Sequence, residues 1–161
     1  MNNKIMLNFL IVFSFIALSF AYFVEFILVH EPCNLCKIER IPYIGSIILV
    51  SLLLFIKKWE KLILSLILLL FVFGSVISIY HVGIEQGIFS ESLLCKLGVN
   101  NNIQNTEDLF KTLEKAPISC KDVTFKIFGL SLATFNAVLS ILISCIIFKM
   151  LVKKWIKLIK K

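Results

Sequence analysis

The sequence predicts an all-α membrane protein: a bundle of four transmembrane helices with two cysteine-bearing loops on the extracytoplasmic side. Of the 161 residues, 59% are hydrophobic and the mean hydropathy is +0.96, which leaves too little polar surface for a soluble domain. The apolar residues form four long runs, and about 20 apolar residues can cross the hydrocarbon layer as a helix. We therefore expect one integral membrane domain, residues 1–161, acting as a monomer.

The net charge of +7 does not indicate nucleic-acid binding. The basic residues stand in short groups beside the apolar runs, where they fit membrane topology and contact with lipid headgroups. We expect no nucleic-acid partner.

The first predicted span covers residues 5–29 and is interrupted only by Glu25. Small residues near its middle resemble a signal-peptide cleavage site, but the apolar run continues well past them, so we expect an uncleaved helix. The second apolar run is short unless its helix begins upstream, beside two cysteines. We therefore place the second span at residues 34–56.

The third and fourth spans are predicted at residues 62–82 and 127–148, with a long loop at 83–126 between them. Within this loop, Thr106 is a suitable N-cap for a short amphipathic helix that Pro117 would end. The basic tail, residues 149–161, has the pattern of an amphipathic helix lying on the membrane surface.

The distribution of lysine and arginine predicts the orientation. Ten basic residues fall on the side of the termini and seven on the side of the two loops, so the positive-inside rule favours cytoplasmic termini. With four spans, the first loop and the long loop share one side of the membrane. That side is the extracytoplasmic one, where disulfides persist.

Five cysteines are present, and four of them lie in these two loops: Cys33, Cys36, Cys95 and Cys120. An even set outside the membrane is compatible with two disulfides. The fifth, Cys145, lies within the fourth span, and we interpret it as a small apolar residue of the core.

The Cys33-x-x-Cys36 pair has two chemical interpretations, a redox pair or half of a metal site. A zinc site usually has four ligands, often in two close pairs. Cys95 and Cys120 are far apart in the sequence, which disfavours zinc, although four thiolates could still converge. We assign no metal to the protein.

The redox interpretation accounts for more of the local sequence. If the second helix begins near Asn34, Cys33 lies at its cap, and Cys36 and Arg40 share one face a turn apart. The helix N-terminus and a guanidinium would both favour a thiolate at Cys36. An ordinary arginine at the membrane interface is an equally good explanation of Arg40.

A dithiol at the membrane surface needs an electron acceptor, and a lipid-soluble quinone suits a thiolate beside a cation. His81 lies at the outer end of the third span, with Glu85 one turn later. This histidine could bind a quinone oxygen or carry a proton, or it could simply be satisfied by headgroups or water. Cys95 and Cys120 would form the second pair, as an exposed disulfide open to attack or as a structural staple.

Three stretches together resemble a known family, the bacterial disulfide bond formation protein B (DsbB) family. They are PCNLCKIER, which holds the first cysteine pair, YHVGIEQGIF at the end of the third span, and SCKDVTFKIFGLSLATFNAV, which leads into the fourth. The resemblance covers nearly the whole chain. It implies a multi-pass protein of the bacterial inner membrane.

The resemblance also implies a reaction and a role for each matching residue. A DsbA-like thioredoxin-fold partner would attack the Cys95–Cys120 disulfide at Cys95, and the electrons would pass to Cys33–Cys36. Cys36 would deliver them to ubiquinone or menaquinone. Arg40 would polarise the quinone site, and His81 would lie close to the quinone.

Two alternatives remain from the residues. A vitamin K epoxide reductase-like protein would run electrons the other way, but in that family the C-x-x-C lies near the last spans. A non-enzymatic, metal-binding membrane accessory protein would use the same cysteines as ligands.

Overall fold

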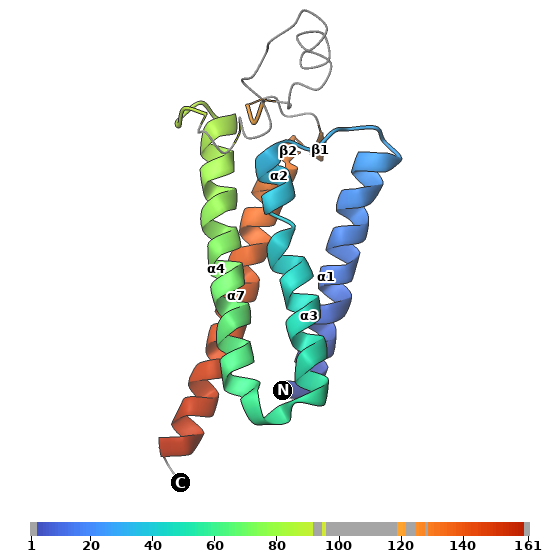
Figure 1. Cartoon of the computed structure of the whole chain (residues 1–161). Coiled ribbons are helices and arrows are strands. Elements are labelled where there is room, and N and C mark those ends of the chain that lie inside the picture. Colours follow the sequence, from blue (N-terminus) through green and yellow to red (C-terminus); the bar gives the residue numbers. More distant parts are fainter. Residues whose placement is uncertain (1–2, 92–94, 96–118, 122–124, 128, 160–161) are drawn as a thin grey trace, which may run out of the picture.

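Helices running side by side form almost all of the described chain (Figure 1). The computed structural model describes residues 3–91, 95, 119–121, 125–127 and 129–159. The helices are α1 (Asn3–Phe26), α2 (Asn34–Ile38), α3 (Ile41–Phe55), α4 (Glu60–Glu85) and α7 (Leu132–Ile159). A 3-10 turn, η1 (Lys57–Trp59), joins α3 to α4. The two short strands are β1 (Lys126–Ile127) and β2 (Leu130–Ser131).

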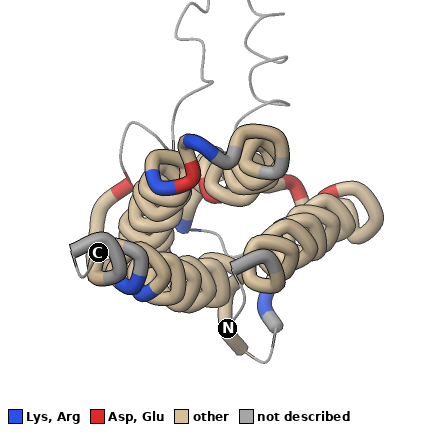
Figure 2. The backbone as a smooth tube through the Cα atoms, turned by 90° about the horizontal axis from the view of Figure 1, so that it is seen from below, with Lys and Arg blue, Asp and Glu red and all other residues tan. Residues whose placement is uncertain are grey.

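Three of these helices, α1, α4 and α7, are long and apolar enough to cross a membrane. Helix α4 packs against α3 and α7, and α1 packs against α3. Large apolar side chains remain exposed along all of them, as lipid-facing residues would be. Seen end-on, acidic and basic residues are few among the tan ones (Figure 2). The fold is therefore a helical membrane bundle.

The second predicted span is not one continuous helix. Helix α2 ends at Ile38 and α3 begins at Ile41, with Pro42 in its first turn. Proline lacks an N–H, and its ring clashes with the carbonyl four residues earlier, so a helix from Asn34 cannot run unbroken through Pro42. The break places Glu39 and Arg40 between two helices, and the 15 residues of α3 are fewer than a spanning helix usually has.

Helix α4 comes close to this break through a glycine. A Cβ at Gly74 would lie 2.8 Å from Cγ of Pro42, closer than real Cβ atoms come to a neighbour. Gly74 therefore lets the start of α3 rest directly on α4. Directly after Pro42, Tyr43 packs edge-on against Phe71 in the core, with ring centroids 5.5 Å apart.

The fourth predicted span begins later than expected. Residues 126–131 contain the short antiparallel pair of β1 and β2, with Gly129 at a φ of +83° between them. Helix α7 begins after Ser131, whose hydroxyl accepts a hydrogen bond from the backbone N–H of Thr134 at 3.2 Å, as an N-cap does. The helix therefore begins five residues after the expected start of the span at residue 127.

From the sequence we expected the basic tail to lie on the membrane surface as an amphipathic helix. In the structure it is not a separate helix. Helix α7 continues through it to Ile159, because the sequence from Leu132 onward contains no glycine or proline to stop it. The predicted short helix between Thr106 and Pro117 lies outside the described residues.

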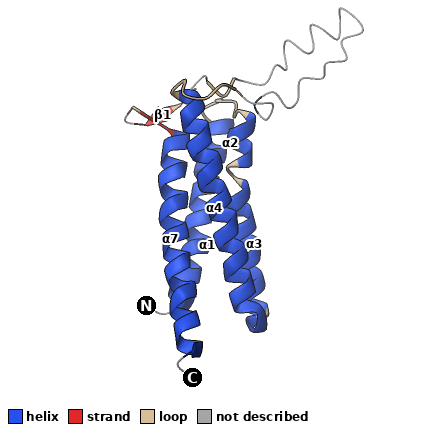
Figure 3. Cartoon of the chain, turned by 90° about the vertical axis from the view of Figure 1, so that its left-hand side faces the viewer, coloured by secondary structure: helices blue, strands red, loops and turns tan. Residues whose placement is uncertain are grey.

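The two ends of the bundle differ. The start of α1 and the end of α7 lie at one end, and α2 and the β-hairpin lie at the other (Figures 1 and 3). The second end holds the first cysteine pair and the polar residues described next.

Candidate functional site

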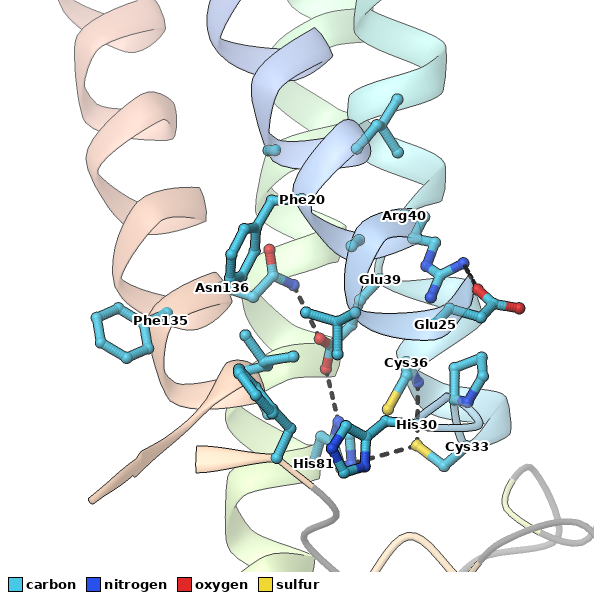
Figure 4. A pocket seen from close by; sticks show the side chains of 18 of the residues that line it. Phe20, Glu25, His30, Cys33, Cys36, Glu39, Arg40, His81, Phe135 and Asn136 are labelled. Atoms are coloured by element: carbon cyan, nitrogen blue, oxygen red, sulfur yellow. Dashed lines mark hydrogen bonds and ion pairs between the residues drawn. The ribbon is translucent and has the colours of Figure 1, made fainter. Parts of the chain in front are cut away.

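A cavity of about 300 Å³ opens beside α2, lined by residues of α1, α3, α4 and α7 and of the α1–α2 connection. Its walls are mainly apolar, with a few polar groups converging on one end (Figure 4). This combination is typical of small-molecule sites. The three residues that the sequence predicted for a quinone, Cys36, Arg40 and His81, all line it.

The C-x-x-C pair forms the N-terminus of α2. Cys33 is the N-cap, and its Sγ accepts a hydrogen bond from the backbone N–H of Cys36 at 3.2 Å. The side chain of Cys33 is buried, that of Cys36 is partly buried, and the structure records both as free thiols. Hydrogen bonding from the Cys36 side chain, and then from His81, lowers the pKa of Cys33 to about 5 although burial opposes this.

His81 joins this cysteine pair to two acidic residues. Its Nε2 lies 3.5 Å from Sγ of Cys33, and its Nδ1 lies 2.8 Å from Oε1 of Glu39. Oε1 of Glu85, one turn later on α4, is 3.8 Å from the same Nε2. The imidazole is buried, so its orientation is fixed by these neighbours.

Glu39 is a buried carboxylate that is hydrogen-bonded through both oxygens. While Oε1 faces His81, Oε2 accepts a hydrogen bond from Nδ2 of Asn136 on α7 at 3.0 Å. Asn136 also bonds to the hydroxyls of Tyr43 on α3 and Ser78 on α4. One polar network thus ties α3, α4 and α7 together beside Cys33 (Figure 4).

Arg40 points to α1 instead of to the cysteines. Its Nη1 forms an ion pair with Oε2 of Glu25, and its guanidinium lies 4.7 Å from the ring centroid of Tyr22. The expected contact between Arg40 and Cys36 is therefore not among the contacts of the described residues. In this site the contacts that stabilise a thiolate, from Cys36 and His81, are made to Cys33.

The second cysteine pair is a disulfide between Cys95 and Cys120, with Cα atoms 5.9 Å apart. The pair is not an exposed disulfide, which was one of the two interpretations that the sequence left open, because Cys95 is 3% and Cys120 is 2% exposed. Both cysteines pack in one cluster with Cys33, Leu35 and Ile84. The side-chain amide of Asn34 adds a hydrogen bond to the carbonyl of Cys95 at 3.3 Å.

Four features of the site were not predicted from the sequence: Glu39, Asn136, Tyr43 and the pairing of Glu25 with Arg40. A signal for Asn136 was present, since an amide within an apolar span is costly unless it has partners there. The sequence signal for Glu39 is Pro42, whose break in the helix turns the carboxylate inward.

Ligand atoms of Cys33, Cys36 and His81 lie within 4.8 Å of one another, a spacing that a metal ion also tolerates. The same spacing suits a reduced dithiol beside a histidine. The four-thiolate site considered from the sequence does not form here, because Cys95 and Cys120 are bonded to each other.

Comparison with known proteins gives one family and one relative. The family model described as disulfide bond formation protein DsbB matches residues 3–150. The chain is 36% identical over 137 residues to the uncharacterized protein RP370 of Rickettsia prowazekii (strain Madrid E), a match that covers 82% of this chain and 78% of the relative. No solved structure matches.

Proposed function

Because this chain belongs to the DsbB family of disulfide bond formation proteins, we propose that it reoxidises a periplasmic DsbA-like thiol oxidoreductase and passes the electrons to a membrane quinone. Membership in the family makes it a membrane oxidoreductase of disulfide bond formation. Beyond this membership, we propose the partner, the quinone and the order of the steps.

The observation that carries the proposal is the packing of both cysteine pairs in one cluster beside a cavity. Cys33 belongs to the cluster with the Cys95–Cys120 pair, Cys36 packs against that cluster, and both cysteines line the cavity. This arrangement supports electron transfer from one pair to the other and then into the bundle.

The steps follow from thiol–disulfide chemistry. A thiolate of the partner attacks Sγ of Cys95, the Cys95–Cys120 bond breaks, and Cys120 leaves as a thiolate. The second thiol of the partner then releases Cys95, so the partner leaves oxidised and the loop pair is left reduced. Exchange with an oxidised Cys33–Cys36 pair restores the loop disulfide and moves two electrons to Cys33 and Cys36.

The cavity fits a quinone ring, since it is mainly apolar and has Arg40 and His81 at its polar end. A bound quinone supplies the acceptor for two electrons and two protons when Cys33 and Cys36 re-form their disulfide. Cys33 and Cys36 both line this cavity, and Cys36 is the more exposed of the two, so we assign to Cys36 the transfer to the quinone. Arg40, held by Glu25, contributes positive charge at the cavity edge.

The topology belongs to the same proposal. We place α3 in the membrane as a fourth, short span, with the cysteine end outside and both termini in the cytoplasm. The termini lie at the end of the bundle opposite the cysteines (Figure 1), which supports this orientation. A membrane-impermeant maleimide added to intact cells after reduction with dithiothreitol should then label Cys36 in preference to a cysteine introduced at Trp59.

The test uses the purified full-length protein in lipid and a reduced DsbA-like protein. Partner oxidation should require added ubiquinone or menaquinone, and Cys36→Ser should abolish it. Cys145 is exposed on α7, so its interpretation from the sequence as a core residue is wrong. Because it also does not line the cavity, Cys145→Ser is the matched control and should retain activity. Quinone-dependent turnover in Cys36→Ser would refute the proposed route.

A further inference from the structure

We propose that Asn136 is a positioning residue that, with Tyr43 and Ser78, aligns the Glu39 carboxylate on His81 and so governs proton exchange at Cys33. The inference rests on the proposed function and deepens it. It assigns a role to α7, which contributes no cysteine or ionisable side chain to the cavity wall.

The orientation of the Asn136 amide follows from counting donors. Ser78 has one hydroxyl proton, and its Oγ lies 2.8 Å from the Gly74 carbonyl, which can only accept. Toward Asn136, at 2.7 Å, Ser78 therefore acts as the acceptor, so the NH₂ group must face it. The carbonyl oxygen of Asn136 then faces Tyr43, whose hydroxyl donates to it at 2.5 Å.

This orientation makes the two oxygens of Glu39 unequal. Oε2 faces the Asn136 NH₂ group, which has no lone pair to accept a hydrogen bond, so a proton on Oε2 would point at a donor. Oε1 faces Nδ1 of His81, which can give or take a proton. Proton exchange at Glu39 is thus confined to the oxygen that faces His81.

The same constraint selects the histidine tautomer. With Glu39 as a carboxylate, Nδ1 of His81 carries the proton, and the lone pair of Nε2 faces Sγ of Cys33 at 3.5 Å. When Cys33 ionises, its S–H bond breaks, an N–H bond forms at Nε2, and the sulfur keeps the electron pair. The resulting imidazolium lies between two anions, the Cys33 thiolate and Glu39, which stabilise it. The lowered pKa of Cys33 agrees with this arrangement.

Other ionisable groups face this cavity from each neighbouring element except α7, and all of them stay unchanged in the Asn136→Leu variant. They are Glu25 from α1, His30, Glu31, Cys36 and Arg40 from the segment around α2, Tyr43 from α3, and Glu85 from α4. Only Tyr43 among them bonds directly to Asn136.

The experiment measures the pH dependence of Cys33 alkylation in quinone-free protein reduced with dithiothreitol. Iodoacetamide is the probe, and peptide mass spectrometry assigns the alkylated cysteine. Wild type should be half-maximal near pH 5. Asn136→Leu, which keeps the branched shape and the number of heavy atoms and removes both N–H donors, should raise this midpoint by about one pH unit, a roughly tenfold change in the thiol–thiolate equilibrium.

Tyr43→Phe is the second variant and preserves the packing of the ring. It releases the Asn136 carbonyl oxygen and should move the midpoint in the same direction by less. Tyr80→Phe is the matched control, since its hydroxyl bonds only weakly, at 3.4 Å, to the carbonyl of Ser90. Its midpoint should equal that of wild type.

A folded Asn136→Leu protein with the wild-type midpoint would overturn the inference. So would a turnover rate that falls equally at every pH with an unchanged alkylation midpoint, because that result describes a structural residue. If Asn136→Leu fails to fold, the alkylation midpoint of Tyr43→Phe tests the inference: a raised midpoint supports it, and the wild-type midpoint overturns it. A shifted midpoint in a protein without quinone-dependent turnover would sustain the inference and refute the proposed function.

Discussion

At the scale of single residues, Glu39 is the link between the fold and the chemistry. It is 7% exposed, and its carboxylate receives hydrogen bonds from His81 and Asn136, which come from two different helices. A buried carboxylate is stabilised only by such partners. Glu39 therefore depends on the assembled bundle, and His81 depends on Glu39.

Glu39→Gln keeps the shape of the side chain but removes its charge and its ability to take a proton. We expect quinone-dependent turnover to fall about 100-fold, the lower range for loss of a positioned acid–base group. Initial rates of partner oxidation would measure this. Glu31→Gln removes an exposed carboxylate at the same cavity and should change the rate less than twofold; equal losses in both variants would contradict the assignment.

Arg40 and Glu25 form an ion pair, and their side chains are 13% and 21% exposed. Removing one partner leaves the other partly buried and unpaired, whereas removing both leaves no charge. We expect Arg40→Gln and Glu25→Gln to be individually destabilising and the double variant to recover part of the loss.

The double-mutant cycle should give a coupling free energy of about 1–3 kcal/mol. Thermal or denaturant unfolding in detergent measures it. Additive single effects would mean that the pair contributes nothing to stability.

At the scale of elements, the break between α2 and α3 determines where the site residues point. Pro42 ends α2, turns Glu39 inward, and sits against Gly74 of α4. The short α2 then presents its N-terminus, capped by Cys33, to the cavity and to the loop disulfide.

Gly74→Ala tests this contact. The added Cβ would meet the Pro42 ring, which cannot rotate away, so α3 must shift from α4 at a cost of about 1–3 kcal/mol. We expect a lower unfolding temperature together with slower turnover. Val76→Ala, on the exposed face of the same helix, is the control and should change neither.

The existence of the helices was predictable from hydropathy, and their internal ends were not. Apolar runs locate α1, α4 and α7 because long apolar helices satisfy their own backbone in lipid. The break at Pro42, the hairpin at Gly129 and the continuation of α7 to Ile159 depend on single residues within or beside such runs. The positions of Cys36, Arg40 and His81 at one cavity followed from motif and resemblance, whereas the pairing of Glu39 with Asn136 depends on tertiary packing between distant segments.

At the scale of the whole molecule, the loop disulfide is packed onto the helical bundle, which therefore controls access to it. Cys95 and Cys120 pack with Leu35, which is fully buried, and with Ile84 at the end of α4. A thiolate must reach one sulfur of a disulfide to attack it, and a buried disulfide is not accessible to such an attack. We therefore infer that a protein partner must displace this packing before exchange begins.

Leu35→Ala should weaken the packing by about 2–5 kcal/mol at a site with no solvent exposure. The Cys95–Cys120 disulfide should then be reduced faster by dithiothreitol, by about 5- to 70-fold if half of that weakening appears as loop opening. Trapping with a maleimide of known mass at successive times measures the rate. Leu66→Ala, on the exposed face of α4, is the matched control. Equal reduction rates in Leu35→Ala and wild type would show that the disulfide is reached without undocking, and the bundle would then have no part in admitting the partner.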